Sequence, residues 1–193
     1  IDSVKEFADR DLFPYVKEMD ENPAYHKDGK VFVHDQVKTM MYKGGEMGLI
    51  SAPFNYEDGG MQIPFLSHTA ATYILDAANN HLPGYAGLTQ GAAELIIHFA
   101  NKELNQTYVP NMLSGQWGGT MCLTEPQAGS SLSDIVTKAT PTQDGYYKLT
   151  GQKIFISGGD NNFTENVVHL VLARIEGAPK GTKGISLFVV PKN

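Results

Sequence analysis

The sequence contains one cysteine and one tryptophan, and it has no long uninterrupted apolar run. Cys122 has no partner for an intramolecular disulfide, as is typical of proteins in the reducing cytoplasm, and we expect it to be a small core residue. The apolar stretches at 167–173 and 185–190 are much shorter than the roughly 20 residues that cross a bilayer. Residues 1–15 are acidic and mixed, unlike a signal peptide. We therefore predict a cytoplasmic protein that does not engage a membrane.

Several common functional motifs are also missing. No two glycines are separated by a single residue, so there is no dinucleotide-binding fingerprint, and no Gly-Lys-Ser/Thr or Gly-x-Ser-x-Gly occurs. One cysteine cannot build a zinc cage, and the six histidines show no metal-ligand spacing, so we expect no metal site. The net charge is −6 and no basic stripe occurs, which argues against a nucleic-acid partner.

Apolar residues recur at helical spacing through the first 115 residues. Asp2 or Ser3 is expected to cap the first helix, and Pro14 to bend it. The segment 55–64 has the composition of a turn-rich loop. The pattern predicts helices over about residues 4–19, 34–47, 64–80, 88–100 and 102–113.

The period then changes to that of strands, with β-branched and aromatic residues between Gly, Asn, Asp and Pro. We predict strands over 117–123, 135–140, 146–157, 167–174 and 185–190, with Asp144-Gly145 as a hairpin turn. Helices followed by strands indicate an α+β fold. The sequence therefore predicts an all-helical domain over 1–115 and a β-domain over 116–193, with the boundary at Ser114-Gly115.

Two segments of the predicted β-domain carry possible chemistry. The run Trp117–Ser131 begins as a strand and ends in a tight loop, where hydroxyls and main-chain N–H groups could donate hydrogen bonds to an electron-poor ring or an anion. The run Gly151–Gly159 places Phe155 and Ser157 two residues apart, on one face if the segment is a strand. Taken singly, each segment is more typical of ordinary structure than of a binding site.

Together, the two segments are much more specific. The chain has Thr124-Glu125-Pro126-Gln127-Ala128-Gly129-Ser130 and later Gly151-Gln152-Lys153-Ile154-Phe155-Ile156-Ser157. In order and spacing they resemble the acyl-CoA dehydrogenase family, whose β-domain typically reads Thr-Glu-Pro-x-Ala-Gly-Ser-Asp and then Gly-x-Lys-x-Trp-Ile-Thr/Ser. The runs 169–174 and 183–188 are most similar to the branch that contains 3-methylmercaptopropionyl-CoA dehydrogenases. The resemblance implies an antiparallel β-barrel-like middle domain, and it implies that the C-terminal helical bundle of the family is absent here.

The resemblance also implies a cofactor site. Members of the family bind FAD against the β-domain and oxidise the Cα–Cβ bond of an acyl-CoA thioester, passing a hydride to flavin N5. Thr124 would meet the polar edge of the ring, Phe155 would pack on its plane, and Ser157 would bond near N5. Gly129 and Ser130 would lie where the substrate meets the cofactor, with Ser130 touching both. The implied cofactor-binding set is Met121, Leu123, Thr124, Gly129, Ser130, Phe155, Ile156 and Ser157.

Some expectations follow from departures from the family pattern. Phe155 stands where Trp is usual, and Ser131 where Asp is usual. The glutamate base of the family lies in the C-terminal bundle, so we assign no catalytic residue and expect this segment alone to be inactive and to hold FAD weakly. The implied partners are an electron-transfer flavoprotein and further copies of the chain. An acyl-CoA oxidase, or a non-catalytic binding protein on the same scaffold, stays an alternative.

Overall fold

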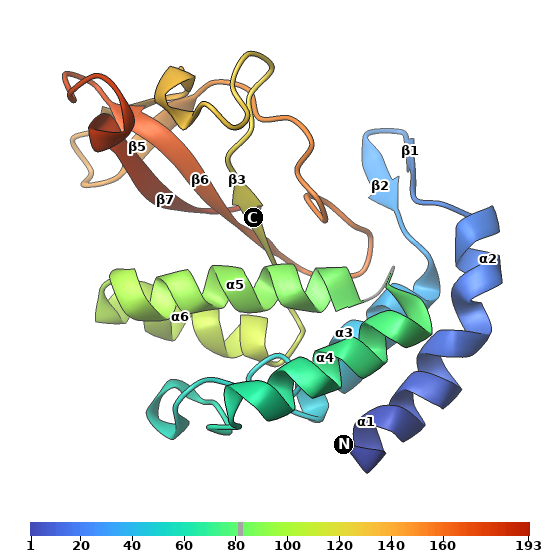
Figure 1. Ribbon diagram of the computed structural model, residues 1–193. Coiled ribbons are helices and arrows are strands. Elements are labelled where there is room, and N and C mark those ends of the chain that lie inside the picture. The colour runs from blue at the N-terminus through green and yellow to red at the C-terminus, as the bar shows by residue number, and fades with distance from the viewer. Residues whose placement is uncertain (81–82) are drawn as a thin grey trace.

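The computed structural model describes residues 1–80 and 83–193, and it places a layer of helices beneath a β-sheet (Figure 1). The first helical region is interrupted: α1 (Asp2–Phe7) leads through a π-helical turn and a 3₁₀ turn into α2 (Val16–Glu21). Pro14 lies in the 3₁₀ turn, as its missing N–H predicts. The expected cap was wrong, because Ile1 occupies the cap position and no side chain caps the helix.

The remaining helices lie close to their predicted ranges, except that α5 begins at residue 83 and not at about residue 88. They are α3 (Asp35–Glu46), α4 (Phe65–Asn79), α5 (Pro83–Phe99) and α6 (Lys102–Leu113). His34 Nδ1 caps α3 by accepting from the N–H of Gln36 at 3.1 Å, and Asn101 Oδ1 caps α6 by accepting from Leu104 at 2.9 Å. Side-chain caps thus fix where these two helices begin.

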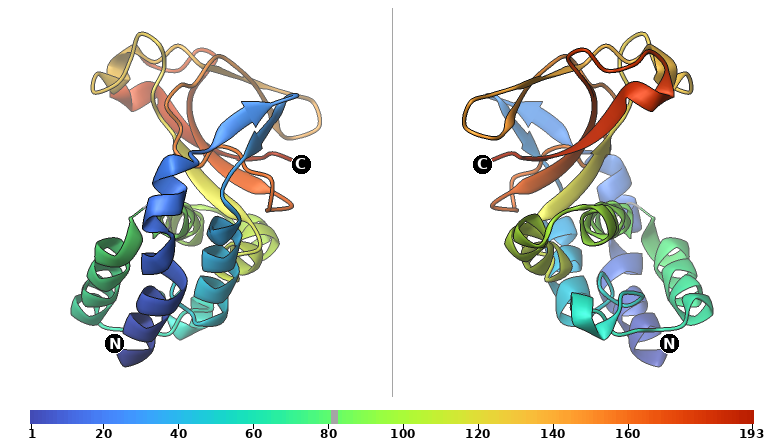
Figure 2. Two further views of the ribbon diagram at one scale, coloured as in Figure 1. Left: turned by 90° about the vertical axis from the view of Figure 1, so that its right-hand side faces the viewer. Right: turned by 90° about the vertical axis from the view of Figure 1, so that its left-hand side faces the viewer.

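The helical part also contains a β-hairpin, so the expectation of an all-helical domain over 1–115 was wrong. Strands β1 (Tyr25–Lys27) and β2 (Lys30–Phe32) pair antiparallel around Asp28-Gly29, both of which have positive φ. Such a turn matches the twist of two paired strands. The hairpin rises beside the sheet (Figures 1 and 2), and the N–H of Val33 reaches Asn162 Oδ1 at 3.0 Å.

The sheet is built around β6 (Val167–Ile175). Strand β7 (Ile185–Pro191) runs antiparallel along one edge, while β3 (Gly118–Cys122) and then β4 (Lys138–Pro141) pair parallel with the other edge. Strand β5 (Tyr147–Thr150) pairs antiparallel with β4 across the predicted Asp144-Gly145 turn. The described strands therefore form an open, mixed sheet, not the antiparallel barrel that we expected. Periodicity identifies strands, but it does not show which distant strands pair or in which direction.

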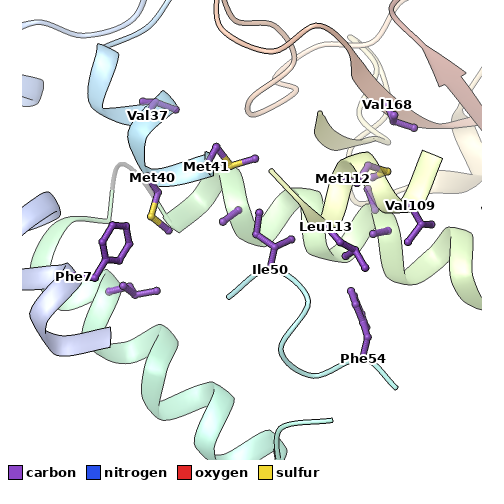
Figure 3. Packing of buried hydrophobic residues seen from close by; sticks show 14 of the residues in the cluster. Phe7, Val37, Met40, Met41, Ile50, Phe54, Val109, Met112, Leu113 and Val168 are labelled. Carbon is purple, nitrogen blue, oxygen red and sulfur yellow. The ribbon is translucent and has the colours of Figure 1, made fainter. Parts of the chain in front are cut away.

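Helix α5 lies directly under β3, and the two share one hydrophobic core. Thr89 Oγ1 on α5 accepts a hydrogen bond from the N–H of Gly119 on β3 at 3.0 Å. Figure 3 shows Met41, Met112 and Val168 pointing into the region between the helices and the sheet. The helical layer thus supports the strand from which the first motif segment continues.

Gly119 allows this close approach. A Cβ there would lie 2.8 Å from Met112 Cε, 2.9 Å from Ala92 Cβ and 3.0 Å from Thr89 Cα. We expect Gly119→Ala to lower the free energy of unfolding by about 1–3 kcal/mol, because helix and strand must separate. Gly118→Ala is the matched control, since its Cβ meets nothing closer than 3.7 Å. Equal denaturant midpoints for the two variants would contradict the packing argument.

Candidate functional site

The structure brings the two motif segments together. The N–H of Ile154 donates to the carbonyl of Thr124 at 3.0 Å. Lys153 Nζ donates to the carbonyl of Leu123 at 3.0 Å and to Glu125 Oε1 at 2.8 Å. The end of β3, the loop after it and the segment 153–157 therefore form one continuous surface.

Glu125 is the anchor of this surface. Its side chain is buried, with the residue only 2% exposed. Its carboxylate accepts from Thr137 Oγ1 at 2.5 Å, the N–H of Val136 at 2.7 Å, and Gln127 Nε2 and Lys153 Nζ at 2.8 Å. Burial by itself raises the pKa of this carboxyl, but the bonds from Lys153, Thr137, Val136 and Gln127 outweigh it and hold the pKa at about 2. Glu125 is therefore ionised at neutral pH.

Gly151 makes room for this anchor. A Cβ on Gly151 would lie 2.4 Å from Thr137 Oγ1 and 2.8 Å from Thr137 Cα. Any larger residue would push Thr137 away from the carboxylate that it donates to. The Gly-x-Lys part of the second motif thus has a steric reason for its glycine and an electrostatic reason for its lysine.

Phe155 does not lie in a strand. Strand β5 ends at Thr150, and the backbone of Phe155 has a φ of +56°. The predicted strand over 146–157, with Phe155 and Ser157 on one face, was therefore wrong beyond residue 150. Lys153 turns inward to Glu125 and the chain leaves the ladder. Even so, Phe155 is 88% exposed and available for contact.

A positive φ is strained for a bulky residue and costs on the order of 1–3 kcal/mol. An 88% exposed ring gains little from burial in return. An exposed aromatic residue held in an unfavourable conformation is typical of a position kept for a ligand.

Three predicted site residues present free hydroxyls. The hydroxyls of Thr124, Ser130 and Ser157 have no hydrogen-bond partner among residues 1–80 and 83–193. In contrast, Ser131 Oγ donates to Asp134 Oδ2 at 2.9 Å, which restores a carboxylate next to the position where the family pattern has Asp. The free hydroxyls and the exposed ring suit a flat ligand with a polar edge.

The other predicted residues complete the surface. Leu123 and Ile156 are half-buried, and Met121 packs against the core from β3. Gly129 is exposed, and a Cβ there would meet nothing within 4 Å. Gly129 is thus not required for packing within the described part of the chain.

The ion pair between Lys153 and Glu125 is the functional feature that sequence reasoning missed. We expected Glu125 to be part of the loop motif and gave Lys153 no role. A signal was present: each otherwise uncharged motif contains one charged residue, and the two charges are opposite. Buried charges of opposite sign are typically paired.

Other kinds of site find no support in the described residues. Within 1–80 and 83–193, no group of three or more His, Cys, Asp or Glu side chains could hold a metal ion, and His81 lies outside these ranges. Across the same ranges no helix has both the length and the hydrophobicity to cross a membrane. A hollow of about 750 Å³ lies between the start of α6 and strands β5 and β7, and none of the predicted site residues lines it.

Helices followed by a mixed sheet define an α+β protein, and its β-part carries an exposed aromatic ring and free hydroxyls. This chain belongs to the acyl-CoA dehydrogenase family. Residues 1–116 match the family's N-terminal domain, and residues 120–193 match its middle domain.

Relatives and solved structures agree with this assignment. The 3-methylmercaptopropionyl-CoA dehydrogenase of Ruegeria pomeroyi is 40% identical over 173 residues, which are 90% of this chain and 29% of that protein. The butyryl-CoA dehydrogenase structure from Megasphaera elsdenii is 25% identical with a TM-score of 0.79, covering 98% of this chain and 46% of that one. A solved structure described as the electron transferring flavoprotein of Acidaminococcus fermentans is 28% identical with a TM-score of 0.78, covering 100% of this chain and 46% of that one. The chain thus spans less than half the length of these relatives.

Proposed function

We propose that this chain supplies the flavin-facing part of an FAD-dependent acyl-CoA dehydrogenase. The observation that carries the proposal is the single surface formed by residues 121–131 and 153–157, with Phe155 exposed and its backbone strained. Family membership agrees with FAD as the cofactor. A domain boundary at Ser114-Gly115, a cytoplasmic location and assembly into homo-oligomers stay predictions.

Each residue of the proposed site has a distinct task. Phe155 supplies an apolar face for the ring, with Met121, Leu123 and Ile156 at its edge. Thr124 and Ser157 offer their free hydroxyls to the polar atoms of the ring. Gly129 and Ser130 leave space and a hydroxyl for the substrate, with Ser130 able to contact the thioester side of an acyl-CoA.

When bound, FAD accepts a hydride from the substrate, and that chemistry belongs to the cofactor. The task of this chain is to bind and orient. Hydrogen-bond donors aimed at a ring that becomes electron-rich favour the reduced state, because they stabilise the added charge. The hydroxyls of Thr124 and Ser157 are suited to this task because no other described side chain uses them.

No carboxylate of the site is suited to act as the catalytic base. Glu125 is buried and fully engaged, and its pKa of about 2 leaves it a very weak base. We therefore expect chain 1–193 alone to be inactive and to bind FAD weakly. Titration with free FAD checks this, and a dissociation constant below roughly 1 μM would contradict it.

The experiment that tests the function uses the protein at its natural full length. We expect it to purify with FAD and to lose flavin absorbance when an acyl-CoA is added without oxygen. An electron transferring flavoprotein is the electron acceptor that we propose, in agreement with the fold likeness to a structure described in those words. Rapid reoxidation by oxygen would instead show an acyl-CoA oxidase, and absence of flavin would refute the proposal.

Substitution of Phe155 in the full-length protein tests the proposed FAD site. Phe155→Asn is expected to stabilise the FAD-free protein by about 0.5–1 kcal/mol, because Asn tolerates positive φ better than Phe. The same change is expected to weaken FAD binding about tenfold, since ring stacking is lost. Thermal melting and FAD titration measure the two effects.

Two further variants serve as controls. Phe155→Trp should keep FAD affinity. Tyr146→Asn removes a 60% exposed aromatic residue from the loop between β4 and β5 and should change neither quantity. Unchanged FAD affinity in Phe155→Asn would exclude Phe155 from the cofactor site.

A further inference from the structure

We infer that Lys153 and Glu125 are positioning residues, which hold the two flavin-facing segments in register although neither side chain faces the ligand. This inference rests on the proposed function. It concerns residues 123–124 at the end of β3 and residues 154–157 of the second motif.

The first step is the placement of Lys153. Its ammonium group lies between the two segments and donates to the carbonyl of Leu123 at 3.0 Å and to Glu125 Oε1 at 2.8 Å. Its side chain is only 11% exposed, so it is held in place and does not sample solvent. Lys153 therefore binds the residues before and after Thr124, whose own hydroxyl is free.

The second step is the direct link between the segments. The N–H of Ile154, the residue next to Lys153, donates to the carbonyl of Thr124 at 3.0 Å. The backbone of Phe155 follows at once with its positive φ. A strained conformation persists only where its surroundings fix it, and the bonds of Lys153 and Ile154 are the fixed points immediately before it.

The third step is the anchoring of Glu125. Its carboxylate is bound by Thr137 and Val136, which precede β4, and by Gln127 in its own loop. The N–H of Glu125 also donates to the carbonyl of Ala128 at 2.8 Å, which closes the turn toward Gly129 and Ser130. The sheet therefore holds Glu125, Glu125 holds Lys153, and Lys153 holds both ligand-facing segments.

A buried ion pair can stabilise a fold without setting a ligand site, and a double variant separates the two roles. Lys153→Met leaves a buried carboxylate without its ammonium partner, so it destabilises the protein for reasons unrelated to FAD. Adding Glu125→Gln removes that charge. The double variant Lys153→Met/Glu125→Gln is expected to regain part of the lost stability, because the charge is gone although the new amide group points a donor at the N–H of Val136 or Thr137. The thioether that replaces the ammonium group still cannot donate a hydrogen bond to the carbonyl of Leu123.

The protein at its natural full length is compared with Lys153→Met, with the double variant and with Lys192→Met as a control. Lys192 pairs with Asp160, so its loss is the same change of charge without the loss of a hydrogen bond to residues 123–124 or 154–157. Two quantities are measured: the dissociation constant for FAD, and hydrogen exchange over residues 152–158 with bound FAD removed.

We expect the double variant to melt above Lys153→Met and below the wild type. It should still bind FAD about tenfold more weakly than the wild type and exchange residues 152–158 about tenfold faster, as loss of one buried hydrogen bond to a charged group predicts. Recovery of both FAD affinity and slow exchange together with stability would overturn the inference, because the pair would then be purely structural. If the wild type binds no FAD, the proposed function fails, while the exchange rates still decide whether the pair holds the segments.

Discussion

Lys153→Met is expected to lower the free energy of unfolding by about 3–5 kcal/mol at neutral pH, because it leaves a buried carboxylate unpaired. Glu125 is 2% exposed, and Lys153 is the one ammonium group that pairs with it among the described residues. Water cannot replace the lost partner without opening the loop. Urea unfolding of the variant and the wild type gives the difference directly.

Acid should remove the stabilisation that Glu125 provides in the wild type. The pKa of its carboxyl is about 2 in the folded protein, against an ordinary value of 4.5. A lowered folded-state pKa means that the stabilisation is complete above pH 4.5 and is lost as the pH falls through about 2. Such a shift corresponds to roughly 3 kcal/mol. The loss in free energy of unfolding caused by Lys153→Met should therefore become smaller over the same pH range, because the unpaired carboxyl becomes neutral.

The control for this prediction is the surface pair between Lys192 and Asp160. Both side chains are about one-third exposed, and we expect Lys192→Met to cost less than about 1 kcal/mol. If Lys153→Met costs no more than Lys192→Met, the pair between Lys153 and Glu125 does not stabilise the fold.

Local chemistry explains which elements could be predicted from the sequence. Helix α6 is found at its predicted residues because Asn101 caps it and Leu113 is followed by Ser-Gly. The Asp144-Gly145 turn is confirmed, because Gly145 has a φ of +83° that glycine adopts without strain. The same dipeptide at Asp28-Gly29 was overlooked, because the strands beside it are only three residues long and show no clear alternation. Pairing of β3 with β6 joins residues about fifty positions apart, which no local pattern encodes.

The sequence was enough to predict that the two motif segments lie together, but not how they are held in place. Motif order was enough to suggest that Thr124 and Phe155 lie close together, and the bond from Ile154 to Thr124 shows that they do. The prediction that Phe155 and Ser157 lie on one face of a strand was wrong, because Lys153 turns inward to Glu125 and takes the chain out of the sheet. A buried ion pair between two motifs depends on the folded geometry, and residue patterns show only its charges.

Gly115→Ala is expected to be among the most damaging substitutions in the helical layer, with a loss of about 3 kcal/mol or more in the free energy of unfolding. Gly115 has a φ of +75°, and a Cβ there would lie 2.0 Å from the carbonyl oxygen of Met41. That oxygen belongs to the backbone of α3, so no side-chain rotation relieves the clash. The segment between α6 and β3 is thus packed tightly against α3.

Gly145→Ala separates the effect of backbone strain from the effect of the clash with α3. Gly145 has a φ of +83° but nothing within 4 Å of its Cβ position, so its substitution carries the backbone strain without the clash and should cost only about 1 kcal/mol. Denaturant unfolding of both variants gives the difference that is due to contact with α3. Equal losses would mean that strain alone acts at Gly115. A much larger loss at Gly115 would mean that contact with α3 sets the direction in which the chain enters β3, and through β3 the place of the loop that carries Thr124 and Glu125.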